Sequence, residues 1–419
     1  MATHTDSPST EPMTSNSGPS DATSGPRPPL LSRPLLLRFV SMVGASLSFF
    51  LLLSVVPAYA AERGGGGAAG LATGSLMLAT VLGELVTPRL VARFGYRLTL
   101  MAGLLLLGAP ALVLTVSGQA AWITAVCFVR GLGFALTIVA GGALTASLIP
   151  DERRGEGLAL VGVVSGVPSL VALPLGLWLA GRVGYGPVAV AGGLAALAAI
   201  VFVLGLPDRA DARADRSEQP LGVVRGLRTG ALLRPVVVFA ATATAAGIVV
   251  TFLPLAVPSA SAGVVAVALF VQPAASTLTR WLAGRHGDRH GSERLVLPGL
   301  LLSALGVLVI ALSGDPVAVI TGTALFGAGF GITQNATLAL MYTRVSAASY
   351  GTVSALWNLA YDGGMGLGAA GFGITAGLTG YPWAFALTAL LMLGAVAPAL
   401  RDRVTAPCAH SPVPDGAPR

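Results

Sequence analysis

Long apolar runs are the feature that most restricts what this chain can fold into. Along most of the sequence they reach or exceed the roughly 20 residues that a helix needs to cross a bilayer. Hydrophobic residues make up 54% of the chain and charged residues only 10%, so its surface cannot be covered by polar groups as in a soluble protein. The sequence therefore predicts an all-α integral membrane protein.

Hydropathy divides these runs into twelve predicted transmembrane helices. Six precede a polar stretch that is rich in both signs of charge, and six follow it. The predicted ranges are 35–60, 68–87, 98–117, 121–149, 158–180 and 186–206 in the first half, and 235–257, 262–283, 295–313, 317–343, 350–378 and 382–400 in the second.

An internal repeat relates the two halves. Residues 196 positions apart (285 minus 89) match without a gap, as Arg89 with Arg285 and Gly95 with Gly291. Other matches at this offset are Arg93 with Arg289, Gly103 with Gly299, Gly131 with Gly327, Gly133 with Gly329 and Phe134 with Phe330. Shared apolar composition does not readily align Arg and Gly across loops. We therefore interpret the chain as two six-helix repeats, a common plan for transporters.

The repeat and the polar stretch predict five regions. Residues 1–33 are rich in Ser, Thr, Pro and Gly and are expected to form a disordered tail. Residues 34–206 form the first six-helix half, 207–233 a linker, 234–401 the second half, and 402–419 a second tail.

The distribution of arginine predicts the orientation. All 25 basic residues are arginine, and all but Arg63, Arg130 and Arg182 belong to the tails and loops on the side of the N-terminus. Because basic residues stay on the cytoplasmic side, both termini and the linker are expected there, in a bacterial-type cytoplasmic membrane. The net charge of +7 is spread over short loops, which argues against nucleic acid as a partner. We expect a monomer in the lipid bilayer.

One loop of the second half carries a recognisable pattern, Gly284-x-x-x-Asp288-Arg289-x-Gly291. It resembles the loop motif of the major facilitator superfamily, Gly-x-Leu-Ala-Asp-Arg-x-Gly-Arg-Lys. With the predicted helices and the duplication, the resemblance covers about residues 35–400. It implies a twelve-helix secondary transporter that works by alternating access, and we expect this transporter to export a small organic compound in exchange for protons.

The resemblance also implies that these loops are gates. Glycine permits the tight turn, and the carboxylate and guanidinium can latch neighbouring helix ends in one state and release them in the other. In the first half, Pro88 and Ala92 replace the expected Gly and Asp, so that only Arg93 and Gly95 remain. The predicted gating residues are Glu84, Arg93, Gly95, Arg280, Gly284, Asp288, Arg289 and Gly291.

Glu84 and Arg280 occupy equivalent positions in the two repeats. Their opposite charges at equivalent helix ends are expected to pair when the cytoplasmic gate closes. The alternative is that each side chain separately reaches the lipid headgroups, as long charged side chains at helix ends often do.

Arg130 lies about nine residues into its predicted helix, in Arg130-Gly131-Leu132-Gly133. This stretch is similar to the family motif Arg-x-x-Gln-Gly-x-Gly, but Cys127 stands at the Arg position and Arg130 at the Gln position. An arginine at this depth is unfavourable unless it faces a cavity or a partner. We predict that Arg130 faces the substrate cavity; the alternative is that it extends to the outer surface.

Asp362 is the only carboxylate deep inside a predicted helix, about 12 residues from its start and near the midplane. Ser354, Asn358 and Asp362 recur every four residues and share one helix face. Ionisable groups at this depth usually line transport pathways, so Asp362 is the predicted proton-coupling residue; a structural aspartate is the alternative. The predicted cavity-lining residues are Arg130, Gln272, Gln334, Asn335, Trp357, Asn358 and Tyr361.

No catalytic triad, phosphate-binding loop or zinc-protease motif occurs in the sequence, so neither an enzyme nor a cofactor is predicted. His286 and His290 flank Asp288 without a further ligand nearby, and no metal site is predicted. Two alternatives to proton-driven export stay open, a proton-coupled uptake permease for a small metabolite and a transport-dead membrane sensor or scaffold.

Overall fold

The computed structural model describes residue 1 and residues 31–149, 154–208, 223–258, 262–345 and 349–404. All regular structure in these ranges is helical, which confirms the predicted all-α fold class. The elements are α1 Arg33–Leu112, the short 3-10 helix η1 Leu114–Val116, α2 Ala120–Leu148, α3 Arg154–Val183, α4 Tyr185–Val203, α5 Val223–Arg228, α6 Gly230–Ala256, α7 Ala262–His290, α8 Glu293–Ile310, α9 Pro316–Tyr342, α10 Tyr350–Thr379, α11 Tyr381–Leu393 and α12 Val396–Val404.

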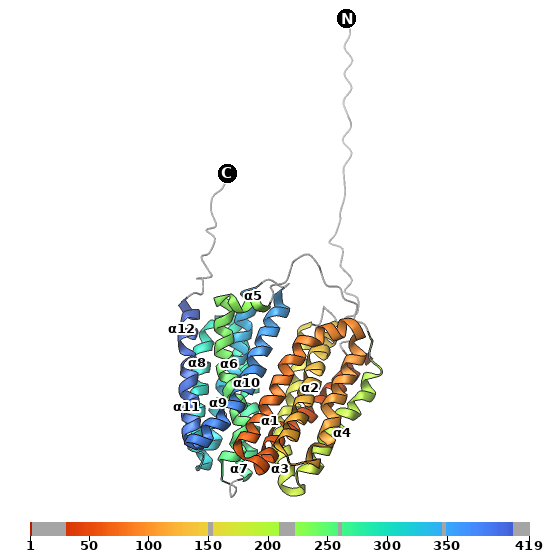
Figure 1. The fold of residues 1–419 in the computed structure, drawn as a ribbon. Coiled ribbons are helices and arrows are strands. Elements are labelled where there is room, and N and C mark those ends of the chain that lie inside the picture. The colour runs from red at the N-terminus through yellow and green to blue at the C-terminus, as the bar shows by residue number, and fades with distance from the viewer. Residues whose placement is uncertain (2–30, 150–153, 209–222, 259–261, 346–348, 405–419) are drawn as a thin grey trace.

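The long α1 is interrupted at two sites. Gly64 and Gly65 leave helical geometry, and Gly95 does so again with a φ of 80°. The chain reverses direction at each site (Figure 1), so α1 consists of three antiparallel segments, residues 33–63, 66–94 and 96–112. Gly65 and Gly95 both have positive φ, a conformation that glycine adopts without the penalty imposed by a Cβ.

The predicted transmembrane ranges all fall largely on these helices. Within the described residues, nine helical stretches are long and apolar enough to cross a membrane, and the whole of α1 counts as one of them. The α10 helix is not among the nine. The number of crossings therefore stays a prediction.

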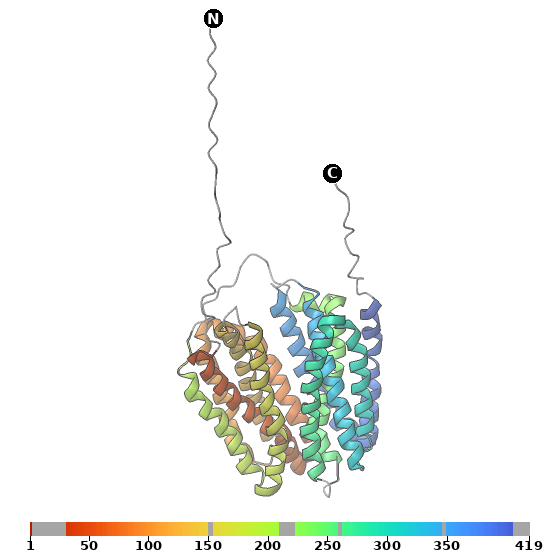
Figure 2. The same cartoon turned by 180° about the vertical axis from the view of Figure 1, so that it is seen from behind.

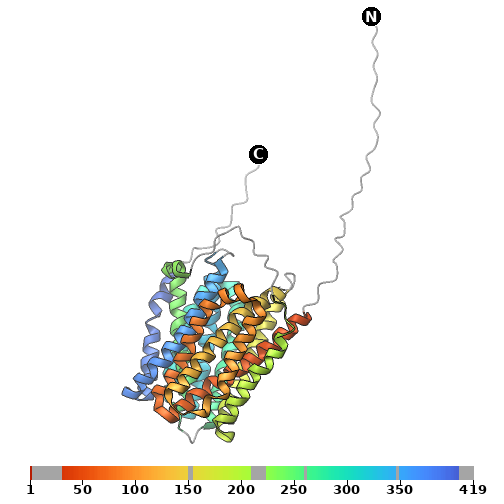
Figure 3. The ribbon, with the colours of Figure 1, turned by 45° about the vertical axis from the view of Figure 1, so that its right-hand side comes forward.

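The helices form a bundle of two halves, with α1–α4 on one side and α6–α12 on the other (Figure 1). The start of α1 and the end of α12 lie at the same face, which we call the terminal face; the opposite face is the far face. Residues 66–94 of α1 pack against α10 (Figure 3), and α3 packs against α7 (Figure 2). These two seams join the halves.

The internal repeat reappears in the backbone geometry. Gly95 and its repeat partner Gly291 both have positive φ, as do Gly184 and Gly380, which are also 196 positions apart (380 minus 184). Each pair ends one helix and begins the next. The two halves therefore turn the chain at equivalent places with the same residue type.

Helix packing repeats as well. A methyl group on Gly131 would collide with the carbonyl oxygen of Leu76, and one on Gly327 would collide with that of Gln272, the repeat partner of Leu76. Only glycine lets these backbones approach so closely. The contacts place α2 against the middle segment of α1, and α9 against α7, in equivalent registers.

The predicted linker 207–233 is partly helical. Its described residues include α5 and the first residues of α6, while 209–222 lie outside the described residues. Its first residues are tied to the turn at Gly95, because the Tyr96 amide donates to the Asp208 carbonyl and the Arg97 guanidinium donates to that of Leu206. The predicted second tail, 402–419, begins inside α12.

Candidate functional site: two carboxyl groups between the halves

The two halves bring two carboxyl groups together. Glu84, on the middle segment of α1, and Asp362, on α10, lie within hydrogen-bonding reach of each other. Asp362 is only 5% exposed, and Glu84 is half-buried. The Oε1 atom of Glu84 is buried and has no hydrogen-bond partner among the described residues. Glu84 and Asp362 thus form an inter-half contact between two acids.

Small residues hold Asp362 at this position. On the α6 side, methyl groups on Gly364 and Gly368 would meet backbone atoms of Ala240 and Thr244. On the α1 side, a methyl group on Gly366 would lie 2.8 Å from the Cβ of Met77. With no side chains to keep the helices apart, α10 packs tightly between α6 and the middle segment of α1.

A phenol and a guanidinium adjoin the carboxyl pair. Tyr361 precedes Asp362 on α10 and interacts electrostatically with both Asp362 and Arg280 of α7. The expected pairing partners Glu84 and Arg280 therefore belong to one cluster, in which Asp362 and Tyr361 connect them. In this conformation Glu84 contacts Asp362 rather than Arg280. Their pairing in another state stays a prediction.

Aromatic rings cover the side of this cluster within the second half. Phe239 of α6 stacks on Trp357 at 4.5 Å between centroids and on Tyr361 at 6.0 Å. Phe330 of α9 lies 6.2 Å from the ring of Tyr361. The Nε1 atom of Trp357 is buried without a hydrogen-bond partner among the described residues. The rings supply an apolar wall with one free donor.

The position of Arg130 differs from the one predicted. Its side chain is 1% exposed and lies inside the first half rather than on a substrate cavity or at the outer surface. The guanidinium donates from Nε to the carbonyl of Leu107 at 3.2 Å and from Nη2 to that of Ser48 at 3.1 Å. Arg130 thus joins α2 to the first and third segments of α1. The hydropathy pattern gave no signal for these carbonyl partners.

The other predicted cavity residues do not all gather around Asp362. Asn358 lies one helical turn before Asp362 and is half-buried. Gln272, Gln334 and Asn335 are also half-buried. Among the described residues, none of these three amides hydrogen-bonds to Asp362. Asn335 instead lies beside Gly284, near the terminal-face end of α7.

The predicted gating loops both lie at the terminal face. In the first half, the carboxylate of Asp208 packs against Gly95, and Arg93 lies over the ring of Phe94. In the second half, the carboxylate of Glu293 packs against Gly291, and the side chain of Arg289 is exposed. The side chain of Asp288 lies outside the described set. Whether these residues act as a latch stays a prediction.

His286 and His290 stack on each other with their ring centroids 4.4 Å apart. Within the described part of the chain, no group of three or more metal-ligating side chains occurs.

A seam at the far face was not predicted. The middle segment of α1 presents Gly66, Gly70 and Gly74 to α10, and a methyl group on Gly70 would collide with the carbonyl oxygen of Ala369. Beside this seam, Thr251 donates a hydrogen bond of 3.1 Å to Thr73 across the two halves. The recurrence of glycine every four residues was the available signal, since it places them on one helix face.

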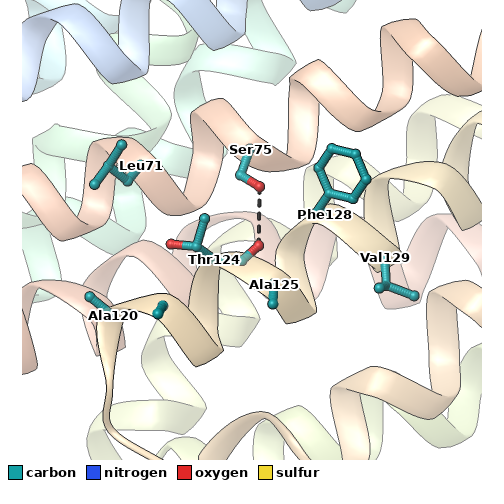
Figure 4. A pocket seen from close by; sticks show the side chains of 8 residues that line it. Leu71, Ser75, Ala120, Thr124, Ala125, Phe128 and Val129 are labelled. Carbon is teal, nitrogen blue, oxygen red and sulfur yellow. Dashed lines mark hydrogen bonds between the residues drawn. The ribbon is translucent and has the colours of Figure 1, made fainter.

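A groove between α1 and α2 lies apart from the carboxyl pair (Figure 4). It has a volume of about 710 Å³ and is lined by Leu71, Ser75, Ala120, Ala121, Thr124, Ala125, Phe128 and Val129. Ser75 donates to the Thr124 carbonyl across it. Leu71 is 56% exposed, and no lining residue is titratable. This groove has no group for proton transfer.

Solved structures with similar folds are transporters. The nucleoside transporter NupG matches with a TM-score of 0.67 and 15% identity, covering 89% of this chain and 99% of its own. The POT family transporter PepTSo matches with a TM-score of 0.71 and 14% identity, covering 90% and 99%. An auto-inhibited POT family peptide transporter matches with a TM-score of 0.74 and 13% identity, covering 93% and 99%. No curated protein sequence matches the chain.

The model of the Major Facilitator Superfamily matches residues 38–369 and, in a second match, 255–416. These matches cover most of the chain and confirm the family resemblance seen in the loop motif. The chain belongs to the Major Facilitator Superfamily and is a multi-pass membrane transporter rather than an enzyme.

Proposed function

We propose that this chain is a proton-coupled transporter that exports a small organic compound by alternating access. It acts in a bacterial cytoplasmic membrane with both termini inside, as a monomer, and Asp362 is its coupling residue. The 34–206 and 234–401 halves rock about the binding site, and the loops around Gly95 and Gly291 bias the two states.

One observation carries this proposal. Asp362 is a buried carboxyl group that faces the opposite half of the bundle, where it contacts Glu84. A carboxyl group in this position changes charge when it binds a proton. Because a buried charge is unfavourable, protonation favours conformations in which the halves close around the carboxyl group. Proton binding is thereby linked to the movement of the halves.

The distribution of charge and rings favours a substrate with an apolar body and a cationic or hydrogen-bonding group. Tyr361 adjoins the carboxyl pair and lies 6.0 Å from the ring of Trp357, whose free Nε1 donor belongs to the same aromatic wall. Uptake of a metabolite uses the same cycle in the opposite direction. The direction of transport therefore has to be measured.

The test is transport in vesicles with an imposed pH gradient. Substrates are first found by comparing sensitivity to, and accumulation of, compounds in cells with and without the gene. Asp362→Asn mimics the protonated carboxyl, so proton-driven accumulation should be lost while downhill exchange continues. Accumulation that persists in the Asn variant would exclude Asp362 as the coupling residue. A wild-type protein that transports nothing would favour a sensor or scaffold.

A further inference from the structure

The contact between Glu84 and Asp362 joins two acids from opposite halves of the molecule. Two carboxylates cannot hydrogen-bond to each other, because both have only acceptor oxygens when ionised. One proton changes this, since a protonated carboxyl donates its O–H to the neighbouring carboxylate. The contact therefore needs a proton to be attractive.

In the part of the chain that the structure describes, the surroundings supply no positive charge in direct contact with the pair. Tyr361 adjoins Asp362 on α10, and Arg280 of α7 interacts with Tyr361. Among the described residues, no cation interacts directly with either carboxyl group. The Oε1 atom of Glu84 is buried without a hydrogen-bond partner among the described residues. A proton shared between Glu84 and Asp362 would let the two carboxyl groups attract each other.

The contact between Glu84 and Asp362 also lies in line with the seam between α1 and α10. The middle segment of α1 and α10 pack closely from Gly66 and Gly373 at the far face through Gly74 and Gly366 to Met77. Glu84 lies about two helical turns beyond Met77, towards the terminal face. The acid pair therefore extends the seam towards the terminal face.

We propose that Glu84 and Asp362 share one proton and act as a pH-dependent clasp between the two halves, with Glu84 as the second coupling carboxyl. While the proton is present, the O–H of one acid donates to the other and the seam stays joined. When the proton leaves to water, the electrons of the O–H bond stay on oxygen and two carboxylates remain. Their repulsion opens the seam, and a freed carboxylate can move towards Arg280.

This proposal rests on the proposed function only in treating Asp362 as a coupling residue. Its test measures the distance between the halves and needs neither substrate nor a gradient. Spin labels are attached to cysteines replacing Arg89 and Gly351, which are exposed near the terminal-face ends of the two seam helices. The background carries Cys127→Ser and Cys408→Ser. Distance distributions are recorded over a pH series for the full chain in lipid nanodiscs.

In the parent protein the population with the longer distance should grow as the pH rises. Glu84→Gln supplies a permanent amide donor to Asp362, so the short distance should persist and the pH response should be lost. Glu84→Asp retracts the carboxyl group and should favour the long distance at every pH. Glu62→Gln is the matched control, since Glu62 is also on α1 but accepts a hydrogen bond from Tyr185 within the same half.

A pH response in Glu84→Gln equal to that of the parent protein would overturn the clasp, as would an equal loss in Glu62→Gln. Both results leave the vesicle test of Asp362 intact. Conversely, a failure of gradient-driven transport with a preserved, Glu84-dependent distance change would refute proton-coupled export and support the clasp.

Discussion

At the scale of single residues, two ionisable side chains deep in predicted helices have different environments. Arg130 is satisfied inside one half, where the backbone carbonyls of Ser48 and Leu107 accept its hydrogen bonds. Asp362 faces the other half and meets a second acid. The surroundings of a charge that is hydrogen-bonded within one half stay the same when the halves move. The surroundings of a charge between the halves change. Asp362 is therefore the better candidate for coupling.

The placement of Arg130 predicts a role in stability. Arg130→Lys keeps the charge, but a single ammonium cannot reach both carbonyls as the planar guanidinium does. Loss of one charge-assisted hydrogen bond should lower the stability of the purified protein by about 1.5–3 kcal/mol, seen as a lower midpoint of thermal unfolding. Substrate affinity should stay within a few-fold. A large loss of affinity at unchanged thermal stability would instead place Arg130 at the substrate site.

At the scale of elements, glycine decides both where helices end and how closely they pack. Gly95 and Gly291 turn the chain at the terminal face with positive φ. Gly70 has no such backbone requirement, but it lets α1 touch the backbone of α10 at the far face. Replacing Gly95 or Gly291 by a larger residue should strain a turn. Replacing Gly70 should push the two halves apart.

The seam predicts the effect of a bulky residue at Gly70. Gly70→Val should push α10 away and favour a state that is open at the far face, because its side chain would overlap Ala369. Alkylation of a cysteine replacing the buried Thr251 should become several-fold faster. Gly67→Val is the matched control, since a methyl group on Gly67 meets no atom within 4 Å. Equal alkylation rates in the two variants would contradict the role of this seam.

At the scale of the whole molecule, the chain is a duplicated bundle whose ends lie at one face (Figure 1). The arginine distribution predicts that this face is cytoplasmic, because basic loops are retained on that side of the membrane. The turn at Gly65 lies at the far face, and the linker follows α4 at the terminal face. Orientation in the membrane is a property of the whole chain that the fold alone does not supply.

Reporter fusions test this orientation. A periplasmic reporter fused after Gly65 should be active, and the same reporter fused after Asp211 should be inactive. A cytoplasmic reporter at the two positions serves as the control and should give the opposite pattern. The reverse result would place both termini outside. The terminal face, towards which the acid pair lies, would then be on the outer side of the membrane.

The sequence by itself predicted the helical membrane fold, the duplication and the family, because hydropathy and repeat spacing follow from the order of the residues alone. It also made Asp362 the candidate coupling residue, since a lone carboxylate in an apolar run stands out without any knowledge of its neighbours. Only the tertiary structure decided which groups meet. In this conformation α1 packs along α10 and brings Glu84 to Asp362, while the pairing of Glu84 with Arg280 in a closed gate stays a prediction. Arg130 donates to backbone carbonyls, which no side-chain pattern predicts, so its burial depended on how α2 packs against two segments of α1.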